Sequence, residues 1–414
     1  MKKYIFLTFA ISGIGGTQIY VRNKIIFMQK QGWDVLVIST EPGDDICVKE
    51  LQPYRDYIMP ELMQNPFLYS KCQRLNMLYK MMTFVGGNCE NIIIESNFMQ
   101  ISLWGELLAK KMEAKHFVYL IQEDYKMISR KYLDFFNFKY ERGELAGNTK
   151  YALKQLFKGY RHIPKDKTGE LTAVCYNTIE ECESTFDEYI EKVDFHIGSI
   201  GRVNKPFVNQ MVEDLIEFSK LHKGDTFQLV MFGGSPDKKD LEEIYFKVKD
   251  IENLSVFITG PIFPIPKTIL DKMDAFISSA GAARTSSDAG YITITIDAND
   301  FEPIGILGYT TNDNVHRNPE IPHKTTINLL DEILYKKKFQ KITPDVKMSS
   351  ADFMEVFKTH LAYIQESKRE KVYYNIKLLS PKKINIIGYR IFGKEKFTRV
   401  YKTLVKMKPL FQKG

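Results

Sequence analysis

Three glycines near the start of the chain have the type and spacing of an anion-binding turn. Gly13, Gly15 and Gly16 follow an apolar run that begins at Tyr4, and a helical pattern follows them. Glycine lets the backbone turn sharply and approach a ligand closely, and a helix start presents unpaired N–H groups to an anion. The spacing departs from the dinucleotide fingerprint, and no acidic residue clearly ends the next strand, so a dinucleotide-dependent oxidoreductase is disfavoured.

A second group of small and basic residues lies in the other half of the chain. Gly281, Arg284, Thr285 and Ser286 form a small-residue turn that leads into a helix. Such a turn suits a diphosphate that is held by backbone N–H groups and one guanidinium. A helix cap without a ligand would use the same residue types, so both interpretations stay open here.

The elements that must position these turns alternate between strands and helices. The glycine turn lies between an apolar run from Tyr4 and a second run at 34–39, which predicts a βαβ unit. Further strands are expected at 92–95, 117–121, 173–176, 195–200, 227–232, 256–259, 275–278 and 293–297, with helices at 211–221, 240–248 and 267–273. Residues 125–160 are predicted as irregular helices with a long loop. The alternation predicts parallel sheets covered by helices on both faces, and the strands are too many for one ordinary sheet.

Composition limits the class of protein. The chain has 414 residues, 44% of them apolar and 26% charged, which is enough for sizeable cores in two or three domains. Its five cysteines are an odd number without a Cys-x-x-Cys pair, so we expect a reducing cytoplasm, no disulfide framework and no metal site. The apolar start is short and lacks a signal cleavage site, and no apolar run approaches the roughly 20 residues of a membrane helix.

Ordered motifs in both halves resemble glycosyltransferases of the GT-B type. The first turn is similar to the Gly-Gly-x-Gln start of those enzymes through Gly15, Gly16 and Gln18. The second half resembles the donor-binding domain of family 4, which includes bacterial polysaccharide and capsule glycosyltransferases; the segments that carry the likeness are 197–205, 228–234, 253–260 and 274–279. The resemblance implies an α/β GT-B fold, with two Rossmann-like doubly wound domains facing a cleft and a basic C-terminal extension.

The resemblance also implies which residues hold the nucleotide-sugar donor. It assigns Arg202 and Lys205 to the diphosphate and places Gly15, Gly16 and Gly233 beside the donor. The departing diphosphate gains negative charge in the transition state, and fixed cations aimed at it lower the barrier selectively. A surface arginine and lysine after a strand are the alternative, although the carboxyl end of a strand in an α/β sheet favours function.

The sequence departs from the family at its paired glutamates. Retaining members carry two glutamates spaced i, i+8, and here Ala280 replaces the first while Asp288 falls at the second. Asp288 is expected to accept hydrogen bonds from the ribose, whereas alanine cannot contact a sugar hydroxyl. Glu302 follows the next strand and is a further donor-site candidate, but spacing does not tell whether it replaces the missing glutamate.

The first half contains candidates for the acceptor side. Residues 117–124 resemble the family strand that ends in a His-Asp-like pair, with Gln122 where histidine is usual. Glu123 and Asp124 are candidates for the general base of an inverting enzyme, whereas a retaining mechanism requires none. His116 begins that strand, at the wrong end for a ligand site at the carboxyl edge.

Charge is concentrated at the end of the chain. From Lys368 onward there are 14 Lys or Arg residues and two Glu. An apolar helical stripe accompanies them at Phe397, Val400, Tyr401 and Leu404, which is typical of a helix that lies on an anionic membrane. Packing of this tail on the body is the alternative. Nucleic acid is disfavoured because the body has no basic groove with interleaved aromatic residues.

These observations predict four segments: an acceptor domain at 1–185, a nucleotide-sugar domain at 186–345, a helix that packs back on the body at 346–367, and a basic amphipathic tail at 368–414. The expected function is a metal-independent, cofactor-free hexosyltransferase that moves a sugar from a nucleotide-sugar donor to a glycan or lipid-linked acceptor. It would work in cell-surface polysaccharide synthesis on the inner face of the membrane. The alternative, motivated by Ala280 and Gln122, is an inactive scaffold subunit on the same fold.

Overall fold

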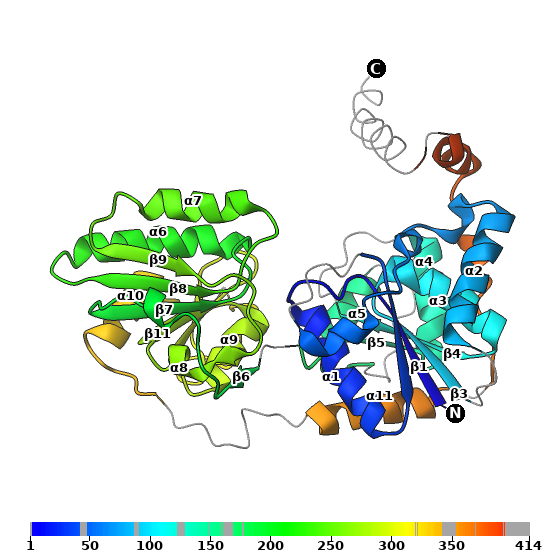
Figure 1. Ribbon diagram of the computed structural model, residues 1–414, viewed down its shortest axis with the longest axis horizontal. Helices are drawn as coiled ribbons and strands as arrows, with labels where there is room; N and C mark the ends of the chain where they lie inside the picture. Colours follow the sequence, from blue (N-terminus) through cyan, green and yellow to red (C-terminus); the bar gives the residue numbers. More distant parts are fainter. Residues whose placement is uncertain are drawn as a thin grey trace.

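The protein consists of two lobes, each built around its own β-sheet (Figure 1). The computed structural model describes residues 2–41, 48–86, 91–121, 129–148, 150–158, 160, 169–175, 178–318, 320, 322–341, 353–368, 370–391 and 393. The predicted fold class is confirmed, because strands alternate with helices and both sheets are largely parallel. The residue boundaries predicted for the domains stay a prediction.

The sheet of the amino-terminal lobe has five parallel strands in the order β2-β1-β3-β4-β5. Their bounds are β1 Lys2–Thr8, β2 Asp34–Ser39, β3 Asn91–Ser96, β4 Lys115–Leu120 and β5 Leu145–Gly147. The chain runs from β1 to β2 on one side and from β3 to β5 on the other. The order therefore reverses between β1 and β3, and the carboxyl ends of these two strands flank the crevice where α/β sheets bind ligands.

Helices cover both faces of this sheet, as the alternation of its side chains requires. Tyr4, Phe6 and Ile93 point toward α1 (Gly16–Lys30) and α11 (Phe353–Glu366). Ile5, Leu7 and Ile94 point to the other face, which is covered by α2 (Lys71–Val85) and α3 (Met99–Met112), with α4 (Arg130–Glu141) and α5 (Lys150–Leu156) beside β5. Short 3₁₀ turns complete the lobe at η1 Lys49–Tyr54, η2 Pro60–Met63, η3 Pro66–Leu68 and η5 Ile376–Leu379.

The sheet of the carboxy-terminal lobe has six strands in the order β13-β12-β11-β7-β8-β9, and β13 is antiparallel. Their bounds are β7 Phe195–Ile200, β8 Phe227–Phe232, β9 Leu254–Ile258, β11 Ala275–Ser278, β12 Thr293–Ile296 and β13 Pro303–Ile306. Here the order reverses between β7 and β11. Between the two large sheets, β6 (Ile179–Glu180) and β10 (Ile265–Pro266) form a small parallel pair, and η4 spans Asp187–Tyr189.

Two apolar layers hold the helices of this lobe in place. On one face, Leu229 and Ile277 pack in a core with α6 (Pro206–Leu221), α7 (Lys238–Val248) and α10 (Thr326–Leu334). On the other face, Val230 and Phe276 pack with α8 (Lys267–Leu270) and with residues of α9 (Ala280–Asp288). Both layers bury large aliphatic side chains, and each such burial contributes about 1.5–3 kcal/mol.

Two predictions of secondary structure were wrong. The described part of the strand expected at 173–176 forms no ladder, because its backbone bonds to side chains: Asn148 Oδ1 accepts from Ala173 N at 3.1 Å, and Asn23 Nδ2 donates to the Val174 carbonyl at 3.2 Å. Within the segment expected to be irregular, β5 pairs with β4. Both errors concern short segments at the edge of the sheet, where the hydrophobic pattern is weak.

Candidate functional site

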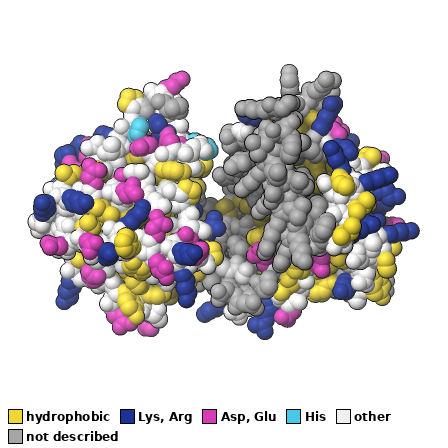
Figure 2. Space-filling view, turned by 90° about the horizontal axis from the view of Figure 1, so that it is seen from above, with side chains coloured by type: hydrophobic (Ala, Val, Ile, Leu, Met, Phe, Trp, Pro, Cys, Tyr) yellow, Lys and Arg dark blue, Asp and Glu magenta, His cyan; other side chains and the backbone are white. Residues whose placement is uncertain are grey.

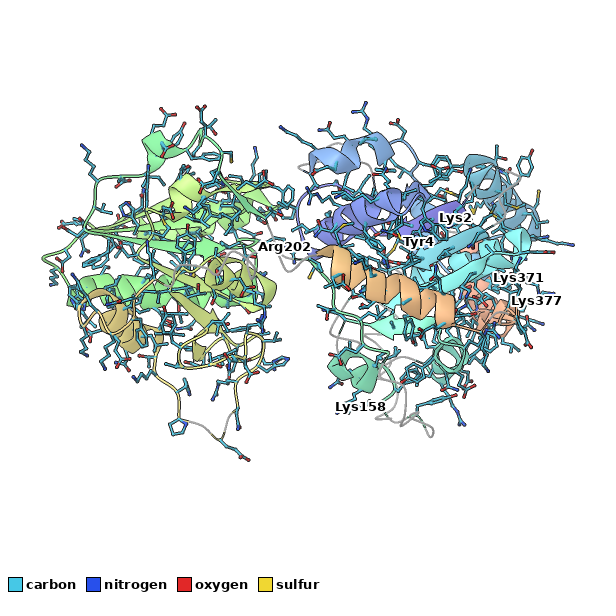
Figure 3. The ribbon with its side chains drawn as sticks, turned by 90° about the horizontal axis from the view of Figure 1, so that it is seen from below. Lys2, Tyr4, Lys158, Arg202, Lys371 and Lys377 are labelled. Carbon is cyan, nitrogen blue, oxygen red and sulfur yellow. The ribbon has the colours of Figure 1, made fainter. Side chains whose placement is uncertain are left out.

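The residues predicted to bind the diphosphate come just after the two strands that border the reversal point of the carboxy-terminal sheet. Arg202 and Lys205 follow β7, and Gly281 and Arg284 lie on α9, which follows β11. Strands β7 and β11 are hydrogen-bonded neighbours, so these two loops meet at the same carboxyl edge. Figure 3 shows Arg202 on the side of its lobe that faces the amino-terminal lobe.

Glycine is required where the loops after β7 and β8 approach each other. A Cβ atom at Gly233 would lie 2.0 Å from the Gly201 carbonyl oxygen, so no larger residue fits there. A Cβ atom at Gly201, whose φ is +133°, would lie 3.5 Å from Lys205 Nζ and 3.9 Å from the Ala282 Cβ. The Lys205 ammonium therefore lies over Gly201, close to the first turn of α9. Lys205 is half-buried and Arg202 is exposed.

The first turn of α9 opens toward this ammonium. Ser279 is the N-cap residue but makes no side-chain cap, and a Cβ atom at Gly281 would meet no atom within 4 Å. Ala280 has a left-handed φ of +53°, and its N–H donates to the Asn314 carbonyl at 2.8 Å. The N–H groups of Gly281 and Ala282 have no acceptor within the helix, since the first turn of a helix leaves them unpaired. A helix start beside a lysine and an arginine is suited to a phosphate group.

The hydroxyl groups of Thr285 and Ser286 face the interior of the lobe. Thr285 Oγ1 donates to the Gly281 carbonyl at 3.1 Å, and buried Ser286 accepts from Thr293 Oγ1 at 2.8 Å. Both residues lie in the second turn of α9, where backbone N–H groups bond within the helix. The Ser286 hydroxyl therefore links α9 to β12, whereas the Thr285 hydroxyl bonds within α9, and only the beginning of the turn stays open to a ligand.

The acidic candidates lie farther along the same edge. Asp288 ends α9 and is half-buried; burial raises its pKa, and nearby Arg284 opposes that shift. Glu302 lies between β12 and β13, where His323 Nε2 is 3.4 Å from its carboxylate. Because β12 is the second strand from β7, Glu302 is about 10 Å along the edge from the strand that carries Arg202.

In the amino-terminal lobe, Gly15 and Gly16 occupy the predicted position between β1 and α1. Gly15 is the N-cap residue of α1, and a Cβ atom at Gly16 would lie 3.4 Å from the Cβ of Cys175. Gln18 Nε2 donates to the carbonyls of Ala10 at 3.2 Å and Ser12 at 3.1 Å, so this residue closes the glycine loop onto the helix. The predicted bases Glu123 and Asp124, and Gln122 with them, lie outside the described residues.

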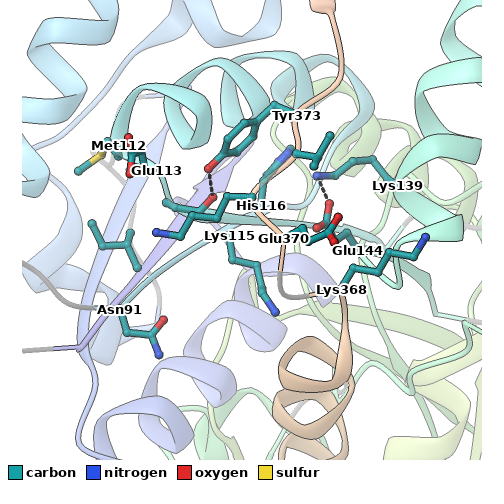
Figure 4. A pocket seen from close by; sticks show the side chains of 14 residues that line it. Asn91, Met112, Glu113, Lys115, His116, Lys139, Glu144, Lys368, Glu370 and Tyr373 are labelled. Carbon is teal, nitrogen blue, oxygen red and sulfur yellow. Dashed lines mark hydrogen bonds and ion pairs between the residues drawn. The ribbon is translucent and has the colours of Figure 1, made fainter.

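A polar pocket of about 260 Å³ lies at the opposite end of the amino-terminal sheet (Figure 4). It is bordered by the amino ends of β3 and β4 and by residues after α11; its lining includes Asn91, Lys115, Lys139, Glu370 and Tyr373. None of the predicted site residues that the structure describes lines it. The described candidate binding residues and this pocket are therefore separate features of the molecule.

Sequence inspection missed a Ser-His-Glu arrangement near this pocket. His116 Nδ1 is 2.6 Å from Glu106 Oε2, and its Nε2 is 3.0 Å from Ser96 Oγ. All three are buried, and a Cβ atom at Gly105 of α3 would lie 2.3 Å from Ser96 Oγ. Burial and the Lys139 charge lower the pKa of His116 to about 4. The helix leaves no room for a substrate, so this arrangement is structural.

The described residues hold no group of three or more His, Cys, Asp or Glu that could bind a metal ion. In the same part of the chain, no helix is both long and apolar enough to cross a membrane.

Comparison with solved structures identifies the fold. The chain is similar to a glycosyltransferase from Rickettsia africae ESF-5, at 13% identity and a TM-score of 0.57 over 89% of this chain and 99% of that one. It is similar to the lipopolysaccharide outer core galactosyltransferase WaaB, at 13% identity and a TM-score of 0.52 over 87% and 99%. It is also similar to HepE from Anabaena in complex with UDP and glucose, at 12% identity and a TM-score of 0.59 over 87% and 98%.

The chain thus has the fold of GT-B glycosyltransferases. No family model and no curated protein matches its sequence. The predicted GT-B fold is confirmed, whereas membership of family 4 and the Glu-x7-Glu correspondence stay predictions.

Proposed function

We propose that the protein is a glycosyltransferase that moves a hexose from a nucleotide-sugar donor to a glycan or lipid-linked acceptor. The observation that carries this proposal is the meeting of Arg202, Lys205 and the open first turn of α9 at the reversal point of the second sheet. Phosphate groups are the ligands that such an edge is suited to hold. Because HepE is described in complex with UDP and glucose, we take UDP as the donor nucleotide.

The proposed chemistry uses these groups on the departing diphosphate. Its negative charge increases as the bond to the sugar breaks, so cations and N–H groups already in position stabilise the transition state more than the bound donor. Lys205 lies over Gly201, where it would face one phosphate, and the N–H groups of Gly281 and Ala282 would face the other. The exposed guanidinium of Arg202 would add a second positive charge beside the diphosphate. These groups need neither a metal ion nor a cofactor.

The remaining donor contacts are assigned from the family resemblance. Asp288 would bind the ribose hydroxyls. Glu302, taken from its place after β12 and not from the resemblance, is a further candidate at the donor site. Glycines 15, 16 and 233 would let the backbone approach the donor. On the acceptor side, Glu123 or Asp124 would take the proton of the acceptor hydroxyl if the enzyme inverts the anomeric centre.

We place this activity in cell-surface polysaccharide synthesis on the inner face of the membrane. The basic tail from residue 368 supports this placement, because its cations would attract anionic lipids near a lipid-linked acceptor. Nucleic acid is not among the proposed partners. The apolar stripe at Phe397, Val400, Tyr401 and Leu404 lies outside the described residues and stays a prediction.

The test is incubation of the pure protein with a panel of UDP-sugars, with and without a lipid-linked acceptor extract. Release of UDP, or transfer of the sugar, supports the enzyme. Ala280 motivates the alternative of an inactive scaffold subunit, which predicts no affinity for nucleotides together with tight binding to a partner glycosyltransferase. Calorimetry with UDP separates the two functions even if the extract lacks the true acceptor, because only the transferase is expected to bind UDP.

A further inference from the structure

A row of exposed isoleucines projects from the helix at residues 383–391, which is drawn in red in Figure 1. Ile384, Ile387 and Ile391 expose 70%, 54% and 68% of their surface. Their i, i+3, i+7 spacing places them on one face of the helix. Single exposed apolar residues are ordinary on protein surfaces, whereas apolar residues aligned on one helix face form a candidate interaction site.

The opposite face of this helix is fastened to the amino-terminal lobe. Tyr389 is buried, and its hydroxyl lies 3.2 Å from that of Tyr69. Arg390 donates to the carbonyls of Leu68 at 3.1 Å and Tyr69 at 2.9 Å. Just before the helix, Asn65 Nδ2 donates to the Leu379 carbonyl at 2.9 Å. These contacts fix the orientation of the helix, so its isoleucine face is held outward.

The chain segment that carries the exposed row is basic. Residues 371–391 contain no acidic side chain, and their five cations are Lys371, Lys377, Lys382, Lys383 and Arg390. Lys371 and Lys377 lie at the end of the lobe away from Arg202 (Figure 3). Figure 2 shows hydrophobic side chains bordered by Lys and Arg on this lobe. Arg390 belongs to the fastened face of the helix, where it lies near Arg74.

We propose that this surface, defined by Ile384, Ile387 and Ile391 with the exposed cations Lys382 and Lys383 at the start of the helix, docks the protein on an anionic phospholipid bilayer. The isoleucines enter the boundary between headgroups and acyl chains, and the cations bind lipid phosphates. The inference rests on the proposed function in one respect, namely that the acceptor is lipid-linked. It differs from the tail prediction, because the surface is formed by a helix that is packed on the lobe.

The experiment is co-sedimentation of the full-length chain with vesicles, in the absence of nucleotide. One set of vesicles contains phosphatidylcholine and phosphatidylglycerol in equal parts, and the other contains phosphatidylcholine alone. The test variant carries Ile384→Ser, Ile387→Ser and Ile391→Ser. The matched control carries Leu221→Ser, Tyr245→Ser and Phe246→Ser in the other lobe, where the exposed fractions are 64%, 44% and 67%. All six positions are exposed, so both variants should remain folded, which circular dichroism checks.

The proposal predicts that the wild type prefers the anionic vesicles and that the isoleucine variant binds them at least about tenfold more weakly. The control variant should bind like the wild type. A third variant, Lys377→Ala with Lys382→Ala and Lys383→Ala, should lose the preference for anionic lipid. Wild-type affinity in the isoleucine variant, or equal loss in the control, would overturn the docking surface.

Calorimetry with UDP on the same samples separates this proposal from the proposed function. Vesicle binding that depends on the isoleucines, in a protein without affinity for UDP, supports the docking surface and contradicts the donor site. The reverse combination contradicts the docking surface and leaves the donor site standing.

Discussion

The two lobes share an architecture but place their charged side chains differently. In the amino-terminal lobe, many charged side chains are buried beside the sheet; they include Lys24, Glu95, Glu106, Lys139, Arg142 and Glu144. In the described carboxy-terminal lobe, the buried polar residues are mainly serines and threonines, and Arg202, Lys205 and Arg284 remain partly or fully exposed at the sheet edge. The described charged side chains are thus buried beside the sheet in one lobe and exposed at the sheet edge in the other.

The buried charges have a specific task in the amino-terminal lobe, which is to hold the returning end of the chain. Lys24 Nζ lies 2.5 Å from Glu95 Oε2 and 3.3 Å from His360 Nδ1 of α11. Beyond α11, Glu106 accepts a hydrogen bond from Tyr374 N at 2.7 Å. Burial alone would raise the pKa of Glu106, but Lys139 and His116 lower it to about 2, so the carboxylate stays charged.

Removal of one partner from a buried pair should produce the largest effect. Lys24→Met leaves the Glu95 carboxylate uncompensated in the core, and we expect the free energy of unfolding to fall by about 3–5 kcal/mol. On the surface of the other lobe, Lys247 Nζ lies 2.9 Å from Glu213 Oε1. Lys247→Met breaks this exposed pair and should lower the free energy of unfolding by only about 0–1 kcal/mol. Urea denaturation measures both. Equal losses in the two variants would contradict the contrast between the lobes.

The second prediction concerns Arg202. Arg202→Ala should reduce transition-state stabilisation by about 2–4 kcal/mol, as removal of other charge-stabilising donors does, and this appears as a lower kcat/KM for sugar transfer. Because the side chain is exposed, stability should change by less than about 0.5 kcal/mol. Transfer kinetics and thermal melting of the same sample test both statements. An unchanged kcat/KM rules out the assignment.

The third prediction is a dependence of stability on pH that comes from the buried histidines. Burial lowers the pKa of His116 to about 4 and that of His360 well below its usual value, with Lys139 and Lys24 adding to the respective shifts. The unfolded chain therefore binds protons first, so the stabilisation present above about pH 6.5 is lost as pH falls. Each histidine should contribute about 1.4 kcal/mol per pH unit below that point.

Urea denaturation at several pH values between 7.5 and 5 measures this slope. His360→Gln should reduce the slope, because one neutral buried imidazole is removed. A slope that is identical in the wild type and the variant would contradict the lowered pKa of His360 in the folded protein.

The fourth and smallest effect concerns Asp288. Asp288→Ala should weaken UDP binding by about 1–3 kcal/mol, which is the range for a hydrogen bond to a charged group. Since burial raises the pKa of Asp288, wild-type affinity should decline as pH falls through that raised pKa, and the variant should lack this decline. Calorimetry across the pH range provides the measurement. Equal UDP affinities in the wild type and the variant would show that Asp288 does not bind the nucleotide.

The sequence predicted the sheets well where its signals are local. The glycine turn before α1 and the apolar runs of β7, β8 and β11 follow from periodicity over a few residues. The same reasoning failed for β5 and for residues 173–175, whose pairing depends on distant partners such as Asn148. The buried charges were also missed, because a lysine such as Lys24 is expected at the surface unless its partner is known.

The candidate site was partly predictable. The family resemblance assigned Arg202 and Lys205, the small-residue turn indicated Gly281, and the strand order brings them to adjacent loops. The inward direction of Thr285 and Ser286 was not predictable, since it depends on where α9 begins and on Thr293 of the next strand. The isoleucines at 384, 387 and 391 belong to the basic, apolar tail that the sequence indicated, but only the packing of Tyr389 shows which face of their helix is exposed.

The most direct measurement of the central claim is a crystal structure of the full-length protein with UDP. The account predicts that the diphosphate lies at the carboxyl edge of the second sheet, in contact with Lys205 and the N–H groups of Gly281 and Ala282, with Arg202 beside it. UDP bound elsewhere, for example in the pocket at the amino ends of β3 and β4, would contradict it. So would the absence of UDP at concentrations that saturate the protein in calorimetry.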